Sequence, residues 1–335
     1  MNHEHPHHRH RRPDHRRHRP GSDPPLTTSL TAVRLGGRPD LPLLVLGPAL
    51  GTSATALWGP CARLLGRDLQ VVAWDLPGHG TNRVDPDAAD DPLTVPALAA
   101  AVLDLVDTMA QGLHRPAFHY AGVSVGGAVG LQLALDAPDR LESLTVLGTT
   151  ARLGDPDSWA ERVATVRERG TEALVEMSSG RWFAPGFVER EPDRAAGLLR
   201  SLTDADDEAY AAVCGALGGF DVRERLGAVA VPLLAVGGSA DVPAPPEEVR
   251  GLAEAVPDGR AVELPDVAHL APAEAPEEVA RLVREHALGP EQDAPGPEAE
   301  QLAAAVHAAR AAGLTAAEVE ALVRAALAGE DPPAG

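Results

Sequence analysis

The chain has 335 residues, and its content of 44% hydrophobic and 23% charged residues is typical of a soluble globular protein with a sizeable core. The formal net charge of −20 argues against nucleic acid as a partner, because a phosphate backbone attracts clustered basic side chains. The two cysteines, Cys61 and Cys214, are too few for a disulfide scaffold and lack metal-ligand spacing, so we expect buried thiols and neither a metal nor a cofactor.

The N-terminal residues 1–27 are predicted to form a disordered, His/Arg-rich arm. Their first twenty positions hold seven histidines and six arginines and nothing that can build a core. A solvated tail is the favoured interpretation, and metal or polyanion binding is the alternative. The chain has no apolar run of ~18 residues and no hydrophobic secretory segment at its start, so we predict a cytoplasmic protein that binds no membrane.

Alternating strands and helices are predicted from residue 28 to residue 150. The apolar runs 41–46, 71–74 and 117–121 are typical of buried strands, and the helical patterns 57–65 and 95–109 lie between them. Such alternation predicts an α/β fold whose mostly parallel sheet is covered by helices on both faces.

A sharp turn at Ser124 is the most informative feature of the sequence. The residues Gly-Val-Ser-Val-Gly-Gly at 122–127 separate the apolar run 117–121 from a helix-like run at 128–137. This is the strand, turn and helix context of a nucleophile elbow, in which a serine hydroxyl is exposed at the top of a sheet. A lone Gly-x-Ser-x-Gly match is a weak signal in a chain with 33 glycines, so the interpretation depends on further residues.

An acid and a base follow in the order that this chemistry needs. Asp241 follows the strand-like run 231–236, and His269 follows the strand-like run 261–264. We therefore predict a catalytic triad in which His269 takes the proton of Ser124 and Asp241 orients the imidazole.

Backbone N–H groups are predicted to stabilise the oxyanion of an acyl-transfer reaction. Val125, directly after the nucleophile, supplies the first donor, and Leu50, in the loop after the first predicted strand, supplies the second. Pro48 in the same loop has no N–H to donate. His79 lies in a turn that contains Gly and Pro, and we interpret it as a structural residue because His269 already serves as the base.

Residues 151–226 interrupt the alternation with helical patterns and are predicted to form a cap, after which the sheet pattern resumes over 227–288. The cap holds six of the chain's ten aromatic residues in less than a quarter of its length, which is compatible with an apolar ligand pocket. A small helical core that needs bulky residues is the alternative explanation.

An arginine of the cap is predicted to bind a substrate carboxylate, because a guanidinium forms two parallel hydrogen bonds to such a group. Arg181 is the first candidate because aromatic residues follow it, and the other cap arginines, Arg162 among them, are expected at the surface. The predicted substrate-binding residues are Trp159, Arg181 and Trp182.

The C-terminal part is predicted to lie outside the main domain. Residues 289–298 form a linker rich in Pro, Gly and Glu, and residues 299–329 form an Ala-rich helical hairpin. This hairpin resembles a fragment of the γ-carboxymuconolactone decarboxylase family. The body of that domain is absent, so we predict no decarboxylase activity. Amphipathic helices often serve assembly, which leaves a homo-oligomer as an open alternative.

Motifs over about residues 30–287 resemble those of the 3-oxoadipate enol-lactonases, which have the α/β-hydrolase fold. The sheet motifs are shared by many α/β-hydrolases, whereas the cap motifs are more specific. The segments that carry the resemblance are Leu50-Gly-Thr with Trp58, Asp75-Leu-Pro-Gly-His-Gly80, Ala121-Gly-Val-Ser-Val-Gly-Gly127, Pro156-Asp-Ser-Trp159, Arg181-Trp-Phe-Ala-Pro-Gly-Phe187 and Tyr210-Ala-Ala-Val-Cys214. The resemblance implies that Ser124, Asp241 and His269 act as the triad on a lactone that bears a carboxylate.

One departure from this family concerns the predicted oxyanion loop. The family usually has Asn-Ser before the leucine of this loop, and here Pro48-Ala49 stands there, which removes polar side chains and favours reduced or altered activity.

The predicted function is therefore hydrolysis of 3-oxoadipate enol-lactone to 3-oxoadipate in aromatic catabolism. A carboxylesterase or perhydrolase with another ester substrate is the first alternative, and a C–C bond hydrolase is a weaker one. From a different class, a non-catalytic binding protein built on the same fold would bind acidic lactones without turnover.

Overall fold

The computed structural model describes residues 29–83, 92–110, 117–290 and 319. The predicted arm, residues 1–27, lies outside the described residues. The same holds for the predicted hairpin, residues 299–329, apart from Val319, and for all but the first two residues of the predicted linker.

Seven strands form one sheet in the order β1-β3-β2-β4-β5-β6-β7. β1 pairs antiparallel with β3, and every other pair of neighbours is parallel. The strands are β1 (Thr31–Gly36), β2 (Leu43–Gly47), β3 (Gln70–Asp75), β4 (Phe118–Val123), β5 (Leu141–Leu147), β6 (Leu233–Gly238) and β7 (Gly259–Leu264).

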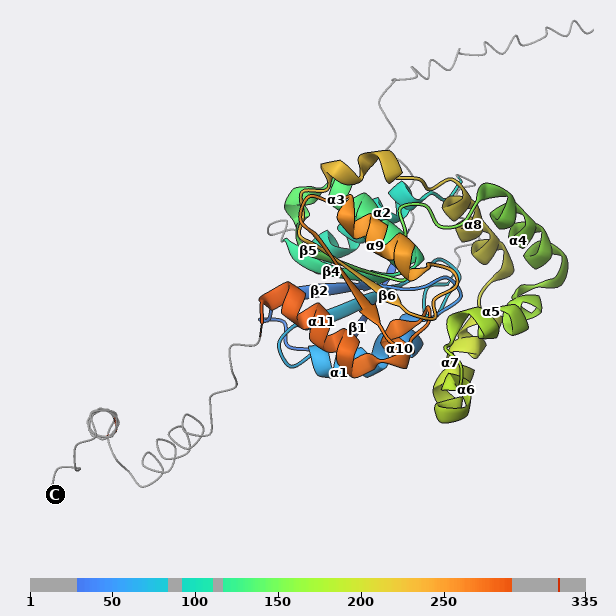
Figure 1. Cartoon of the computed structure of the whole chain (residues 1–335), viewed down its shortest axis with the longest axis horizontal. Coiled ribbons are helices and arrows are strands. Elements are labelled where there is room, and N and C mark those ends of the chain that lie inside the picture. The colour runs from blue at the N-terminus through green and yellow to red at the C-terminus, as the bar shows by residue number, and fades with distance from the viewer. Residues whose placement is uncertain (1–28, 84–91, 111–116, 291–318, 320–335) are drawn as a thin grey trace, which may run out of the picture.

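Helices cover both faces of this sheet (Figure 1). One face carries α1 (Ala54–Leu65), α10 (Ala271–Glu274) and α11 (Pro276–Leu288), and the other carries α2 (Val95–Met109), α3 (Val125–Asp136) and α9 (Pro246–Glu254). Because both faces are covered, β4 and β6 are buried at every position, and their sequences show no alternation of apolar and exposed polar residues. The α/β fold with a mostly parallel sheet is as predicted.

Several helices begin at a residue whose side chain accepts a backbone N–H of the first turn. Such caps satisfy donors that have no partner within the helix. The capping residues are Ser53 for α1, Thr94 for α2, Asp155 for α4 and Asp206 for α8.

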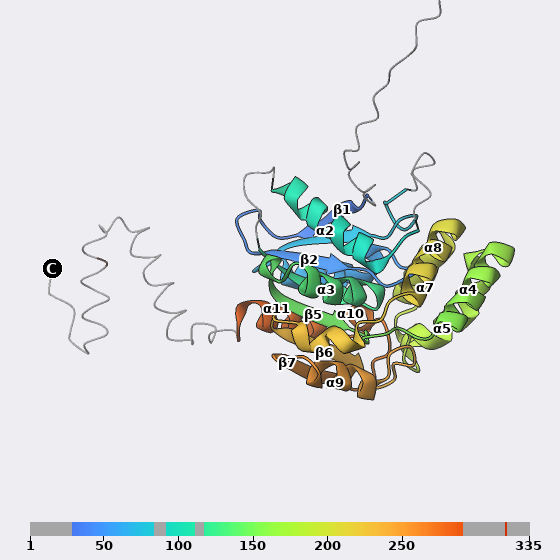
Figure 2. The ribbon, with the colours of Figure 1, turned by 90° about the horizontal axis from the view of Figure 1, so that it is seen from above.

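Between β5 and β6 the chain leaves the sheet and forms the cap, residues 151–226. The cap lies at one end of the molecule, beside the carboxyl ends of the parallel strands (Figure 2). Its helices α4 and α8 pack on each other, and α5 contacts α7. The helices are α4 (Pro156–Arg169), α5 (Val175–Trp182), α6 (Phe187–Arg190), α7 (Pro192–Thr203) and α8 (Asp207–Gly218), with 3-10 turns at Thr171–Leu174 and Arg223–Ala228.

The sequence predicted five of the seven strands and missed β1 and β5. β1 is an edge strand with half-buried positions and Arg34 in its middle, so it lacks a continuous apolar run. β5 carries Glu142, Ser143 and Thr145, which break its apolar run although only Glu142 is exposed. Helix α2 has the bounds that its sequence pattern predicted.

Both cysteines are free and buried, as expected. Burial raises the pKa of the Cys214 thiol to about 12, so this group stays protonated and unreactive at neutral pH. No helix in the described part of the chain combines the length and the apolar character that a membrane crossing needs.

Candidate active site

Ser124 stands at a strained turn between β4 and α3. Its φ of 53° and ψ of −114° lie outside the usual regions for a residue with a side chain. Among the described residues, the only other residue besides glycine with positive φ is Asp266, in the loop that carries His269. Backbone strain of this kind persists only where the surroundings fix it, and here it falls on two loops of one site.

Glycine on both sides of Ser124 makes the turn sterically feasible. A Cβ on Gly126 would lie 2.6 Å from the carbonyl oxygen of Pro48. The absence of a side chain at Gly126 therefore allows the close approach of α3 to the loop after β2. The Gly126 N–H donates to that same Pro48 oxygen at 2.9 Å. The turn is also tied to β5, because the Ser124 N–H donates to the Leu147 carbonyl at 2.9 Å.

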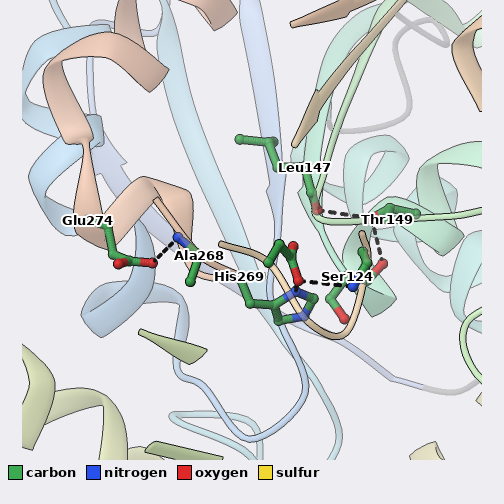
Figure 3. Close-up of polar contacts among 8 residues, drawn as sticks. Ser124, Leu147, Thr149, Ala268, His269 and Glu274 are labelled. Carbon is green, nitrogen blue, oxygen red and sulfur yellow. Dashed lines mark hydrogen bonds and ion pairs between the residues drawn. The ribbon is translucent and has the colours of Figure 1, made fainter. Parts of the chain in front are cut away.

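Asp241 and His269 form a buried pair. Asp241 follows β6 and His269 follows β7, and Nδ1 of His269 lies 3.0 Å from each carboxylate oxygen of Asp241. An ionised carboxylate only accepts hydrogen bonds, so Nδ1 carries the proton and Nε2 is left without one. The Ala244 N–H donates to the Asp241 carboxylate at 2.9 Å and fixes its orientation. Ser124 and His269 lie at the same edge of the sheet (Figure 3).

The predicted oxyanion donors lie beside this group. Leu50 lies in the loop after β2, and Val125 is the first residue of α3. Neither backbone N–H has a hydrogen-bond partner among the described residues, so both are available to an oxyanion. Pro48 donates no hydrogen bond, but its carbonyl accepts the Gly126 N–H and thereby holds the loop against the elbow.

A cavity of about 220 Å³ lies between these loops and the cap. Ser124, His269 and Leu50 line it from the sheet side. All three predicted substrate-binding residues line it from the cap side, namely Trp159, Arg181 and Trp182. The structure thus brings together at one cavity residues that lie up to 220 positions apart, from Ala49 to His269.

Arg162 also lines this cavity, although the sequence predicted it at the surface. Its guanidinium carbon lies 5.2 Å from the centre of the Trp159 ring, in a cation–π contact. The signal that could have found it is the spacing on α4, because residues three apart lie on the same face of a helix.

Two arginines, Arg162 and Arg181, line the cavity from the cap side, together with the acidic residue Asp155. Burial first, and then the positive charge of Arg162, lowers the pKa of the Arg181 guanidinium, whereas Asp241 raises it. Arg162 and Arg181 form no ion pair with any described carboxylate. Two guanidinium groups without a counter-ion at one cavity favour an anionic ligand.

His79 is a buried structural residue, as interpreted from the sequence. Its Nδ1 lies 2.8 Å from the Pro77 carbonyl, and its ring stacks on Tyr210 of the cap with 5.9 Å between ring centres. Burial lowers the pKa of this imidazole. His79 does not line the cavity that holds Ser124 and His269.

Comparison with protein families gives a match to the alpha/beta hydrolase family over residues 43–282. This match contains the elbow, the Asp241–His269 pair and the cap. It ends before residue 299, so it gives no support to the resemblance of the C-terminal hairpin to a decarboxylase family.

Individual proteins similar to this chain give a more specific comparison than the family match. The chain is 31% identical over 205 residues to 3-oxoadipate enol-lactonase 2 of Acinetobacter baylyi, covering 61% of this chain and 73% of that protein. It is 28% identical to RutD of Pseudomonas savastanoi, named as an inferred carbamate hydrolase, over 67% of this chain and 85% of that one. The crystal structure of the enol-lactonase from Burkholderia xenovorans LB400 superposes with a TM-score of 0.71 at 32% identity and covers 77% of this chain and 95% of that chain.

Proposed function

Because this chain belongs to the alpha/beta hydrolase family, we propose that it is a serine hydrolase that opens a carboxylated enol-lactone, the 3-oxoadipate enol-lactone of aromatic catabolism. The observation that carries the proposal is the joint occurrence, at one cavity, of the elbow serine, the paired histidine and two arginines without counter-ions. Two of the similar proteins are named as enol-lactonases, and the name of one of them specifies 3-oxoadipate.

The proposed reaction has an acylation and a deacylation step. The Ser124 hydroxyl oxygen attacks the lactone carbonyl while Nε2 of His269 takes its proton, and Asp241 stabilises the imidazolium that forms. The N–H groups of Leu50 and Val125 donate to the tetrahedral oxyanion. The C–O bond of the lactone then breaks, and the enol oxygen takes the proton from His269. Water, activated by the same histidine, cleaves the acyl-enzyme and releases the acid.

The leaving group explains why opening is one-directional. The enol formed by ring opening stays on the acyl chain and tautomerises to a ketone, so the reverse attack that would close the ring has no enol to use. This chemistry needs no side chain beyond the triad and the two N–H donors. The Pro48-Ala49 pair therefore leaves the proposed acyl-transfer groups complete, although it differs from the usual enol-lactonase loop.

The proposed carboxylate contact comes from the cap. Arg162 and Arg181 line the cavity opposite Ser124 and lack a carboxylate partner in the described part of the chain. A substrate carboxylate would neutralise two guanidinium groups that now face each other, which stabilises the bound state. A neutral ester gains nothing from these groups.

The experiment that tests this function is spectrophotometric turnover of the enol-lactone beside a neutral aryl ester of similar size. We expect kcat/KM for the enol-lactone to exceed that for the neutral ester by at least about 100-fold, as a charged hydrogen-bonded pair provides. Faster turnover of the neutral ester would instead assign an esterase. Faster formation of a peracid would assign a perhydrolase, and faster turnover of a carbamate would assign a carbamate hydrolase. Binding of the lactone without turnover at any pH would assign a non-catalytic homologue.

A further inference from the structure

Glu274, the last residue of α10, lies next to the histidine loop and is not part of the proposed triad. Its carboxylate accepts two backbone N–H groups from different parts of the chain. One oxygen accepts from Ala268, the residue before His269, at 3.0 Å, as Figure 3 shows. The other oxygen accepts from Ala184 of the cap at 2.8 Å.

A second hydrogen bond joins the same two segments. The N–H of Leu270, the residue after His269, donates to the carbonyl of Trp182 in the cap at 3.3 Å. The residues on both sides of His269 are thus held to the cap segment 182–184, once directly and once through Glu274. That segment follows Arg181, and both Arg181 and Trp182 line the cavity.

A carboxylate suits this position in a way that an amide does not. An ionised carboxylate accepts hydrogen bonds at both oxygens, whereas an amide accepts at one and would present its NH₂ group to the other N–H. Charge-assisted bonds of this kind are shorter and stronger than neutral ones. Burial, and to a smaller extent the negative charge of Asp241, raises the pKa of Glu274, whereas the Ala184 and Ala268 N–H groups and His269 oppose that shift.

From these contacts we infer that Glu274 is a positioning residue that couples the cap to the proposed base. Its carboxylate binds the N–H groups of Ala268 and Ala184 together and so fixes the backbone that carries His269. The inference rests on the function proposed above. Glu274 touches neither the proposed nucleophile nor the cavity. Its effect on the reaction passes through the orientation of the imidazole relative to Ser124.

The test compares Glu274→Gln with Glu277→Gln, a matched control whose side chain lies exposed on α11. Turnover of a neutral aryl acetate and the rate of Ser124 phosphorylation by diisopropyl fluorophosphate, which releases fluoride, both require the imidazole but not the cap arginines. For Glu274→Gln we expect kcat and the phosphorylation rate to fall about tenfold with little change in KM, because small displacements of a general base are costly. Glu277→Gln should match the unmodified protein.

A spectroscopic measurement separates positioning from mere stability. The His269 Nδ1 proton, held between imidazole and the Asp241 carboxylate, should give a downfield proton NMR resonance, and Glu274→Gln should shift or broaden it. A Glu274→Gln protein that melts at lower temperature, but keeps the kcat, the phosphorylation rate and this resonance, would overturn the inference.

Two further outcomes are decided by the same measurements. If Glu274→Gln does not fold, Glu274→Asp keeps the charge on a shorter side chain that cannot span both donors. An intermediate loss of kcat in that variant supports the coupling, and unmodified kcat overturns it. If the unmodified protein neither hydrolyses an ester nor reacts at Ser124, the proposed function fails. The NMR comparison then still tests whether Glu274 orients His269.

Discussion

The loops at the carboxyl edge of the sheet and the cap meet at one cavity but are built differently. In the loops, the proposed acid and base are buried and held by each other, since Asp241 and His269 are each 4% exposed and bonded to each other. In the cap, Arg162 and Arg181 are half-buried and have no ion-pair partner among the described residues. This difference fits the proposed function, in which the loops supply the reacting groups in a fixed geometry and the cap supplies the charge that binds the substrate.

The largest expected effect comes from the loop side of this comparison. Ser124→Ala removes the proposed nucleophile while leaving the turn and its hydrogen bonds in place. We expect kcat to fall at least about 10⁴-fold for the enol-lactone and for a neutral ester alike, as for other triad members. Steady-state kinetics with both substrates measures this. Turnover that survives in Ser124→Ala would remove the loops from the chemistry and end the proposed mechanism.

A smaller but still large effect is expected from a methyl group beside the buried pair. Gly148 has a φ of 51°, and a Cβ there would lie 2.9 Å from Asp241 Oδ2 and 3.0 Å from His269 Nδ1. Gly148→Ala should therefore displace the pair, lower kcat about 100-fold and destabilise the fold by roughly 1–3 kcal/mol.

The control for this variant is Gly251→Ala in α9, where a Cβ meets nothing within 4 Å. It should leave kcat unchanged and stabilise the helix by about 0.5–1 kcal/mol. Kinetics and urea unfolding of both variants make the comparison. Equal behaviour of the two would mean that the loops tolerate movement and are not preorganised.

Changes on the cap side should separate the substrates instead of abolishing turnover. Arg162→Met and Arg181→Met keep an apolar stem at the cavity but remove the charge. We expect each to lower kcat/KM for the carboxylated lactone about 10-fold to 100-fold, mainly through KM, and to leave a neutral ester unaffected. Arg167→Met is the control, because Arg167 is exposed on the same helix and pairs with Glu208. Equal losses for both substrates would show that the cap contributes to the chemistry itself.

The sequence predicted the loops of the site better than the cap. Ser124, Asp241 and His269 each follow a short apolar run, and carboxyl ends of parallel strands meet at one edge, so their convergence could be expected. The strands β1 and β5 gave no such run, one because it lies at the edge and the other because of its polar residues.

The cap was harder to predict because its contacts depend on how helices pack. Arg162 reaches the cavity on a helix, α4, that packs on α8, and the sequence does not show which face of α4 this packing leaves toward the cavity; its spacing from Trp159 was the one available signal. Glu274 is similar, since its two N–H partners lie 6 and 90 positions away. Residues whose partners are contacts of this kind can be identified only from the structure.

The smallest expected effect concerns the contact between a loop and the cap at His79, which stacks on Tyr210. Burial lowers the pKa of His79 below its ordinary value of 6.5, so the unfolded chain takes up a proton at this residue before the folded one does. The stability that this residue contributes is therefore present above about pH 6.5 and lost as the pH falls below it.

His79→Phe keeps an aromatic ring against Tyr210 and removes both the titration and the hydrogen bond to Pro77. At pH 7.5 we expect a loss of about 1 kcal/mol in the free energy of unfolding, the usual worth of one hydrogen bond. At pH 5.5 the deficit should shrink or reverse, because only the unmodified protein binds a proton on unfolding at this position. Urea unfolding at the two pH values measures the difference. A deficit that stays constant with pH would mean that His79 takes up its proton over the same pH range in the folded and the unfolded chain, and that burial against Tyr210 does not hinder its protonation.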